Sequence, residues 1–223
     1  VPLLILAYYG AYVIAFRKAS IAIAAAVAVI FAAIAFIYSN NMTLMLRPDR
    51  FLPMYLASSG GVHLNLGDPT LLPRYLHMLL GAVAVAGLLI SLYGVFRRED
   101  WTMRHGSRWF VVATAMNVVV GLWWLVALPR DVMMRFMGAS LAVTVWFGVG
   151  MGTGTVALVC LAVAVRADDP APFIQYGAWT TLVTLVAMLV SRDHVRDGML
   201  RLARFQPATW IEAQWSVIAL FAL

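Results

Sequence analysis

The stretch NLGDPTLLPRYLHMLLGAVAVAGLLI, residues 65–90, decides the fold class. It opens with helix-start signals, because Asp68 is a typical N-cap and Pro69 suits the first helical position. An apolar run follows that is long enough, at about 20 residues, to cross the hydrocarbon core of a bilayer. The stretch therefore predicts a transmembrane helix over 69–96 that carries one titratable ring, His77.

The composition of the whole chain is that of a membrane protein. Of its 223 residues, 63% are hydrophobic and 12% are charged. A soluble domain has roughly 45–50% apolar and about 25% charged residues. The long Ala, Val and Leu runs lack the alternation that membrane β-strands need. We predict an all-α, polytopic transmembrane helical bundle.

Hydropathy and turn signals divide the chain into about six full spans and a truncated seventh. The full spans are predicted over 1–16, 20–46, 69–96, 108–128, 138–165 and 171–191. Residues 47–67 are expected to form an extramembrane loop, and residues 192–214 an amphipathic extramembrane segment. Because the chain opens and closes in mid-span, we expect residues 1–223 to be one transmembrane domain and an internal piece of a longer polypeptide.

The charges indicate which partners to expect. The net charge is +6, and the arginines fall in the connections between spans, where they set topology and meet lipid headgroups. Membrane lipids are therefore expected partners, and nucleic acid is not. The basic residues divide too evenly between the two sides to fix the orientation. The dense connection FRREDWTMRHGSRWF, residues 96–110, favours its own side as cytoplasmic.

His77 is the main candidate for chemistry. It follows the predicted helix start by about nine residues, some 13 Å along the axis, and Gly81 and Ala84 share its face. An imidazole at that depth needs a partner, and histidine is the usual axial ligand of haem b. The small residues would leave room for a porphyrin. The alternative is a histidine that hydrogen-bonds to a neighbouring helix.

Arg74 lies one turn before His77 on the same face. Its guanidinium could bind a haem propionate, or it could be an interfacial arginine that extends its charge toward the headgroups. The other histidines, His63, His105 and His194, are expected to be solvated or interfacial. The sequence has no HExxH motif and no Cys/His cluster, so a zinc site is not predicted.

Two further patterns bear on function. The glycines of 138–165 include pairs four residues apart, which permit close helix packing or make room for a flat cofactor. All acidic residues fall in connections or at span ends, so no chain of carboxylates crosses the membrane. A proton pump or proton-coupled transporter is therefore not predicted.

The order of motifs resembles a known family. A span ends in YSNNMTLMLRPDR (38–50), GDPTLLPRYLHMLLGAVAVAG (67–87) follows a loop, and the basic turn (96–110) precedes a span that ends in LPRD (128–131). This order is similar to that of the large subunit (subunit I) of cytochrome bd quinol oxidases, above all its divergent relatives found beside multihaem cytochromes. The resemblance covers residues 20–131.

The resemblance implies that His77 ligates the iron of a low-spin haem b, with Arg74 near a propionate and Gly81 beside the cofactor. The second ligand would be a methionine after the fourth span, and Met137 is our candidate among Met133, Met134 and Met137.

By the same resemblance, we expect a haem-b subunit of a respiratory complex in the bacterial inner membrane. It would move electrons between the quinone pool and an extracytoplasmic partner such as a multihaem cytochrome c. This would make it a quinol oxidoreductase subunit bound to other subunits. The first span lacks the family's glutamates, so oxygen reduction is not expected. The alternative is a cofactor-free structural transmembrane subunit of a larger membrane complex.

Overall fold

The computed structural model describes residues 2–17, 20–58, 60–61 and 63–202, and every regular element in this part is helical. Five helices are long and apolar enough to cross a membrane: Ile21–Met45 (α2), Leu71–Arg97 (α4), Asp100–Ala127 (α5), Leu141–Ala164 (α7) and Ala171–Leu202 (α8). The predicted class, a multi-pass helical membrane protein, is confirmed.

The described residues contain five such helices, against the expected six full spans and a partial seventh. The first apolar helix, Pro2–Phe16 (α1), has 15 residues, fewer than the roughly 20 that a span needs. The predicted seventh span lies outside the described residues.

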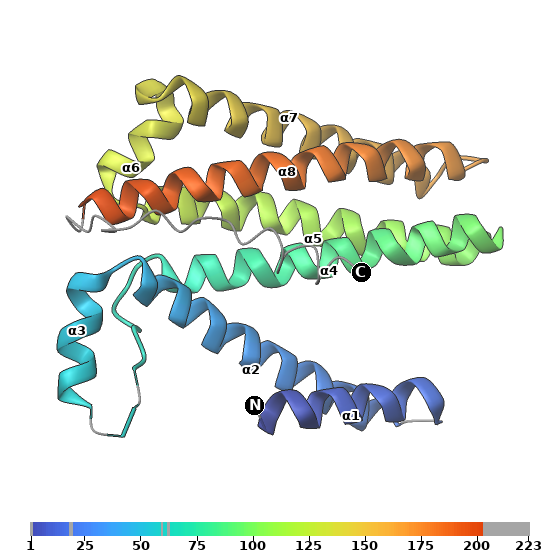
Figure 1. Cartoon of the computed structure of the whole chain (residues 1–223). Helices are drawn as coiled ribbons and strands as arrows, with labels where there is room; N and C mark the ends of the chain where they lie inside the picture. The colour runs from blue at the N-terminus through green and yellow to red at the C-terminus, as the bar shows by residue number, and fades with distance from the viewer. Residues whose placement is uncertain (1, 18–19, 59, 62, 203–223) are drawn as a thin grey trace, which may run out of the picture.

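Three helical hairpins form the molecule (Figure 1). The α4–α5 hairpin lies in the middle, with α7–α8 along one side and α1–α2 along the other. The C-terminal part of α2 contacts the first turns of α4. The Phe36 ring lies edge-on to the Tyr75 ring at a centroid distance of 5.4 Å, and the Ser39 hydroxyl lies 3.8 Å from the Met78 sulfur. The α4–α5 hairpin is therefore the element against which the others are placed.

Short helices join the hairpins at one end of the bundle. Helix α3 (Pro48–Ala57) crosses that end at a steep angle to the spans (Figure 1) and buries none of its residues. The α5–α7 connection contains α6 (Arg130–Met134) and the π-helical turn η1 (Arg135–Ala139). Gly138 has a φ of 109°, which L side chains rarely adopt, and this lets the chain reverse into α7.

Several boundaries differ from the predicted ones. Helix α4 begins at Leu71 with Thr70 at the N-cap position, but Thr70 makes no side-chain cap hydrogen bond. Asp68 caps the chain before the helix, because its carboxylate accepts hydrogen bonds from the Thr70 backbone and hydroxyl at 2.9 and 2.6 Å. The turn between α4 and α5 takes only Arg98, at a φ of 56°, and Glu99, so most of the predicted basic connection is helical.

The extramembrane segments also differ from the expectation. Residues 48–57 of the predicted loop form α3, and the predicted amphipathic segment continues α8 as far as Leu202. At 1.5 Å per residue, the 32 residues of α8 measure about 48 Å, more than the roughly 30 Å of hydrocarbon. One end of α8 therefore projects beyond the lipid core.

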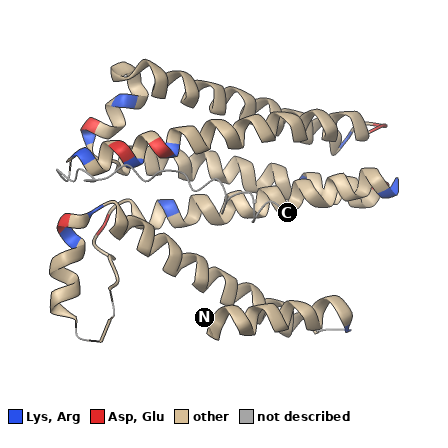
Figure 2. Cartoon of the chain, in the orientation of Figure 1, with Lys and Arg blue, Asp and Glu red and all other residues tan. Residues whose placement is uncertain are grey.

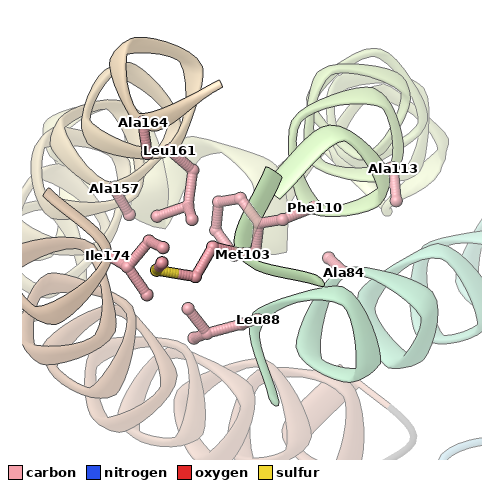
Figure 3. Close-up of a cluster of buried hydrophobic side chains, with 9 residues drawn as sticks. All are labelled: Ala84, Leu88, Met103, Phe110, Ala113, Ala157, Leu161, Ala164 and Ile174. Carbon is pink, nitrogen blue, oxygen red and sulfur yellow. The ribbon is translucent and has the colours of Figure 1, made fainter. Parts of the chain in front are cut away.

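A cluster of buried apolar side chains joins the α4–α5 and α7–α8 hairpins (Figure 3). Phe110 and Met103 of α5 point toward Leu161 of α7 and Ile174 of α8, all at most 5% exposed. In the described part of the chain, charged residues gather toward the two ends of the bundle, and the middle carries none (Figure 2). Lipid and this cluster together cover the apolar surface.

Candidate functional site

The α4–α5 interface is antiparallel, and its register is constant along its length. Each step toward the start of α4 is matched by an equal step toward the end of α5. The facing pairs are Gly94 with Met103, Ser91 with Ser107, Gly87 with Phe110, Gly81 with Asn117, His77 with Gly121, and Arg74 with Trp124.

The half of this interface nearest the Arg98–Glu99 turn, called the turn half below, is packed backbone against backbone. A Cβ added to Gly87 would lie 2.7 Å from the Phe110 nitrogen and 2.8 Å from the Gly106 oxygen. A Cβ on Gly94 would lie 2.6 Å from the Met103 nitrogen. Glycine is required at both positions because the two helices approach too closely for a side chain.

The polar groups of the turn half satisfy one another. The Ser91 and Ser107 hydroxyls lie 3.1 Å apart. Ser107 also donates to the Met103 carbonyl at 2.8 Å, and Ser91 lies 3.1 Å from the same carbonyl and 3.2 Å from that of Gly87. Both serines are fully buried.

The other half, called the distal half, contains Arg74, His77, Gly81, Asn117, Gly121 and Trp124. The His77 ring lies over Gly121, where a Cβ would be 3.2 Å from its Cε1 and 3.3 Å from its Nδ1. It stacks beside the Trp124 indole at a centroid distance of 6.4 Å and an interplanar angle of 16°. Here α4 and α5 are separated by side chains.

Arg74 is only 8% exposed, and its guanidinium carbon lies 5.8 Å from the centroid of the Trp124 ring. This is a cation–π contact. Within the described part of the chain, Arg74 makes no ion pair or side-chain hydrogen bond. A buried guanidinium without an acceptor is costly, particularly at membrane depth.

Unpartnered polar atoms are concentrated in the distal half. Of the four buried side-chain nitrogen and oxygen atoms that lack a hydrogen bond in the described residues, three lie here: His77 Nδ1, Asn117 Oδ1 and Trp124 Nε1. The fourth is His63 Nδ1, beside Phe51 and Tyr55. Because buried polar atoms are normally bonded, the distal half is the candidate binding site.

The predicted site residues are only partly brought together. His77, Arg74 and Gly81 share one face of α4, and a Cβ on Gly81 would meet only the Asn117 amide nitrogen, at 3.6 Å. Met137 lies in η1, which packs on α6 and α7, and its side chain is 54% exposed. The structure does not gather Met137 with the other three.

The room expected beside His77 is mostly filled. Ala84 and Gly87 face α5 closely, and the His77 ring itself rests on α5. Surface pockets of about 300 and 170 Å³ lie at the end of the bundle opposite the Arg98–Glu99 turn, and neither includes His77 or Arg74. The first is lined by Arg47, Asp49, Pro129, Met199 and Leu202, and the second by Asp131, Val132, Arg135, Gly198, Arg201 and Leu202.

The residues present therefore fit a haem in part. Within the described residues, His77 offers a buried Nδ1 that makes no hydrogen bond of good geometry, although the Asn117 backbone lies near the ring. Arg74 offers a positive charge one turn away with no acceptor there. A formed cavity for the macrocycle is not seen around them in the described residues, and the His77 ring would have to turn off Gly121. No group of three or more His, Cys, Asp and Glu able to hold a metal ion occurs there either.

The remaining histidines lie away from this site. His105 stacks on Trp101 at 4.7 Å and accepts a hydrogen bond from the Trp109 indole at 3.1 Å, near the α4–α5 turn. The His194 carbonyl accepts from Arg135 at 3.3 Å.

The glycines of α7 divide into two sets. Gly150 and Gly154 pack on α8, where added Cβ atoms would lie 3.4 Å from Ala187 and Thr184. Gly148 and Gly152 have no such neighbour among the described residues. Close packing therefore explains one of the two glycine pairs.

A polar network fixes the start of α4 to the end of α2. The buried Asn40 amide donates to the His63 carbonyl at 2.7 Å, and its oxygen accepts from the Asn65 backbone at 2.7 Å. Asn65 in turn donates to Asp68 at 3.3 Å. This network orients the first turn of α4, which carries Arg74.

An ion pair lies at the same end, outside the spans. Arg47 donates to both carboxylate oxygens of Asp49, at 3.1 and 3.0 Å. These hydrogen bonds are the main reason that the pKa of Asp49 is lowered and that of Arg47 raised.

The sequence alone does not identify Trp124, Gly121 or Asn117 as site residues. Their spacing of four and three residues puts them on one face of α5. Asn117 is also a strongly polar residue in the middle of an apolar span. These signals mark a face of α5, but they do not say that this face meets His77.

Comparisons with protein-family models, curated proteins and solved structures give no match to this chain.

Proposed function

We propose that the chain is a haem-b-bearing subunit of a respiratory membrane complex that passes electrons between quinone and an extracytoplasmic redox partner. The observation that carries this proposal is the buried His77, whose Nδ1 makes no hydrogen bond of good geometry within the described residues, with Arg74, which has no acceptor there, one turn away. A haem would supply one-electron transfer at that site. His77 would bind the iron, and Arg74 would neutralise a propionate.

The remaining features of the proposal follow from the resemblance to the large subunit of cytochrome bd quinol oxidases. The host membrane would be the bacterial inner membrane, and α1 and a segment beyond residue 202 would complete six to seven spans. Quinone and a multihaem cytochrome c would be the redox partners, and other subunits would supply what this chain lacks. Met137, the second ligand that the resemblance implies, does not lie beside His77 among the described residues. We assign no oxygen reduction to this chain.

The test is a reduced-minus-oxidised absorption spectrum of the purified protein. We expect a b-type α-band that is lost in His77→Ala and kept in His105→Ala. His105 is a matched control because it also lies in a span and contacts a tryptophan, but at the other end of the bundle. Circular dichroism would confirm that both variants are helical. A band that survives His77→Ala would refute the assignment of the ligand.

A second function is favoured by a different observation. The His77 ring is packed against α5 and beside Trp124, which suits a cofactor-free structural subunit of a larger membrane complex. In that case the wild-type spectrum would be flat, and the chain would co-purify with other subunits at fixed stoichiometry. The two proposals are therefore separated by one spectrum.

A further inference from the structure

Two arginines from different helices, Arg74 and Arg192, lie at the end of the bundle opposite the Arg98–Glu99 turn, where α4 packs against α8. Arg74 of α4 is 8% exposed, and the charge of Arg192 of α8 is close enough to repel it. Arg192 lies on the exposed surface and its guanidinium reaches the Met42 sulfur of α2 at 3.9 Å. Both positive charges therefore lie at the end of the bundle where α2 and α8 each contact α4.

The described residues provide no anion between these arginines. Asp68 is the acid that acts on Arg74 electrostatically, but it makes no ion pair with it. Its oxygens accept from Thr70 at 2.6 and 2.9 Å and from Asn65 at 3.3 Å. Other arginines of α8 do have acids, as Arg196 pairs with Asp193 at 3.8 Å.

The depth of the pair indicates the kind of ligand. Arg74 is three residues into α4, or about 5 Å along its axis, and this end of the bundle carries many of the charged residues. Basic pockets between spans at this level bind acidic headgroups. Arginine suits carboxylate and phosphate because its planar donors match two oxygens at once.

We propose that Arg74 and Arg192 together bind one oxyanionic group, a carboxylate or phosphate of a membrane-embedded ligand. Two sources have this chemistry: the phosphate of an anionic phospholipid, and a propionate of the proposed haem. The propionate source rests on the proposed function, whereas the lipid source does not. Trp124 holds the Arg74 guanidinium in place through its ring face.

The experiment measures the lipid first. The purified protein is placed in nanodiscs of phosphatidylcholine with and without phosphatidylglycerol, and native mass spectrometry counts retained phosphatidylglycerol. We expect the wild type to retain it, and Arg74→Gln and Arg192→Gln to retain about tenfold less. Arg196→Gln, one turn further along α8 and already paired, is the matched control and should retain as much as the wild type.

The second arm measures the haem. If retention of phosphatidylglycerol is unchanged but Arg192→Gln lowers the midpoint potential of the b-type band relative to Arg196→Gln, the oxyanion is the propionate. The potential falls because a nearby positive charge is removed. Arg192 is exposed, so this variant should fold even if Arg74→Gln does not.

Two results would overturn the proposal. One is that Arg192→Gln behaves like Arg196→Gln in both arms. The other is that the acceptor belongs to the chain itself, and Glu212, which lies outside the described residues, is the acid to test. If Glu212 pairs with Arg192, then Arg192→Gln and Glu212→Gln should lower the melting temperature equally, and the double variant should lower it no further. A flat spectrum of the wild type refutes the proposed function alone, because the lipid arm is read without a haem.

Discussion

The two halves of the α4–α5 interface are built from the same pair of helices in the same register, yet they differ in whether their polar groups are hydrogen-bonded. In the turn half, Ser91 and Ser107 bond to each other and to backbone carbonyls, and glycines bring the backbones together. In the distal half, His77, Asn117 and Trp124 each leave a buried polar atom without a partner.

This difference in hydrogen bonding and backbone approach indicates which half stabilises the hairpin. Close backbone approach and mutual hydrogen bonds stabilise a helix pair in lipid, where apolar side chains gain little by leaving the hydrocarbon. Unpartnered polar atoms do the opposite, because each carries its desolvation cost without compensation. The turn half therefore holds the hairpin together, and the distal half is where a ligand would restore what is lost.

The largest expected effect is on packing in the turn half. Gly87→Ala would place a Cβ 2.7 Å from the Phe110 nitrogen, and backbone atoms cannot move aside as a flexible side chain can. We expect a loss of about 2–3 kcal/mol in the free energy of unfolding, measured by denaturant titration in micelles. Gly81→Ala is the control in the distal half and should change stability by less than about 0.5 kcal/mol. Equal losses would show that both halves are packed alike.

The next effect has the opposite sign. Asn117→Leu removes an amide whose oxygen is buried without a partner, and leucine has nearly the same shape. We expect the ligand-free protein to gain about 1 kcal/mol, seen as a higher melting temperature. A protein purified with its ligand should instead lose stability, since the ligand would bond to the amide. No change in either form would contradict the view that the distal half is a binding site.

A smaller effect is expected from the serine pair. Ser91→Ala and Ser107→Ala should each cost about 0.6 kcal/mol, the typical value for side-chain hydrogen bonds within membranes. Because the two hydroxyls lie 3.1 Å apart, the double variant should cost less than the two single losses added together. Strict additivity would mean that each serine acts only through its own helix.

The smallest effect is expected from an exposed contact outside both halves. The Arg47–Asp49 pair lowers the pKa of Asp49, mainly through the Arg47 hydrogen bonds. Its stabilisation is therefore complete above the ordinary carboxyl pKa of about 4 and is lost as the pH falls through the lowered value. Solvent screening limits it to below about 1 kcal/mol.

The Asp49 carboxylate is tested by comparing unfolding at neutral and strongly acidic pH. Asp49→Asn should remove only this small pH-dependent part and should leave the α4–α5 interface unchanged. A loss as large as that of Gly87→Ala would show that the α2–α3 junction, and not the hairpin, limits stability.

The membrane class and the cores of the spans could be read from the sequence, because lipid requires long apolar helices whatever their neighbours are. The spans over 20–46 and 69–96 agree with α2 and α4 to within a few residues. The start of α5 at Asp100 could not be read, because a helix continues through charged residues once it leaves the lipid.

The sequence also placed Arg74, His77 and Gly81 on one face of a helix, since that follows from 3.6 residues per turn. It could not say what faces them. Gly121 and Trp124 come into contact with His77 because the turn at Arg98 sets the register of α5 against α4. A shift of one residue in that turn would rotate α5 by about 100° and remove the contact.

The composition alone identifies the environment of the chain: with 63% hydrophobic residues in long runs, it folds as helices in a bilayer. Which polar groups remain without a hydrogen bond depends instead on how the helices pack. Ser91 and Ser107 meet across the interface, whereas His77 and Arg74 meet glycine and an aromatic ring. The physical reason is that a hydrogen bond requires two groups at one place, and a sequence specifies each group but not the distance between them.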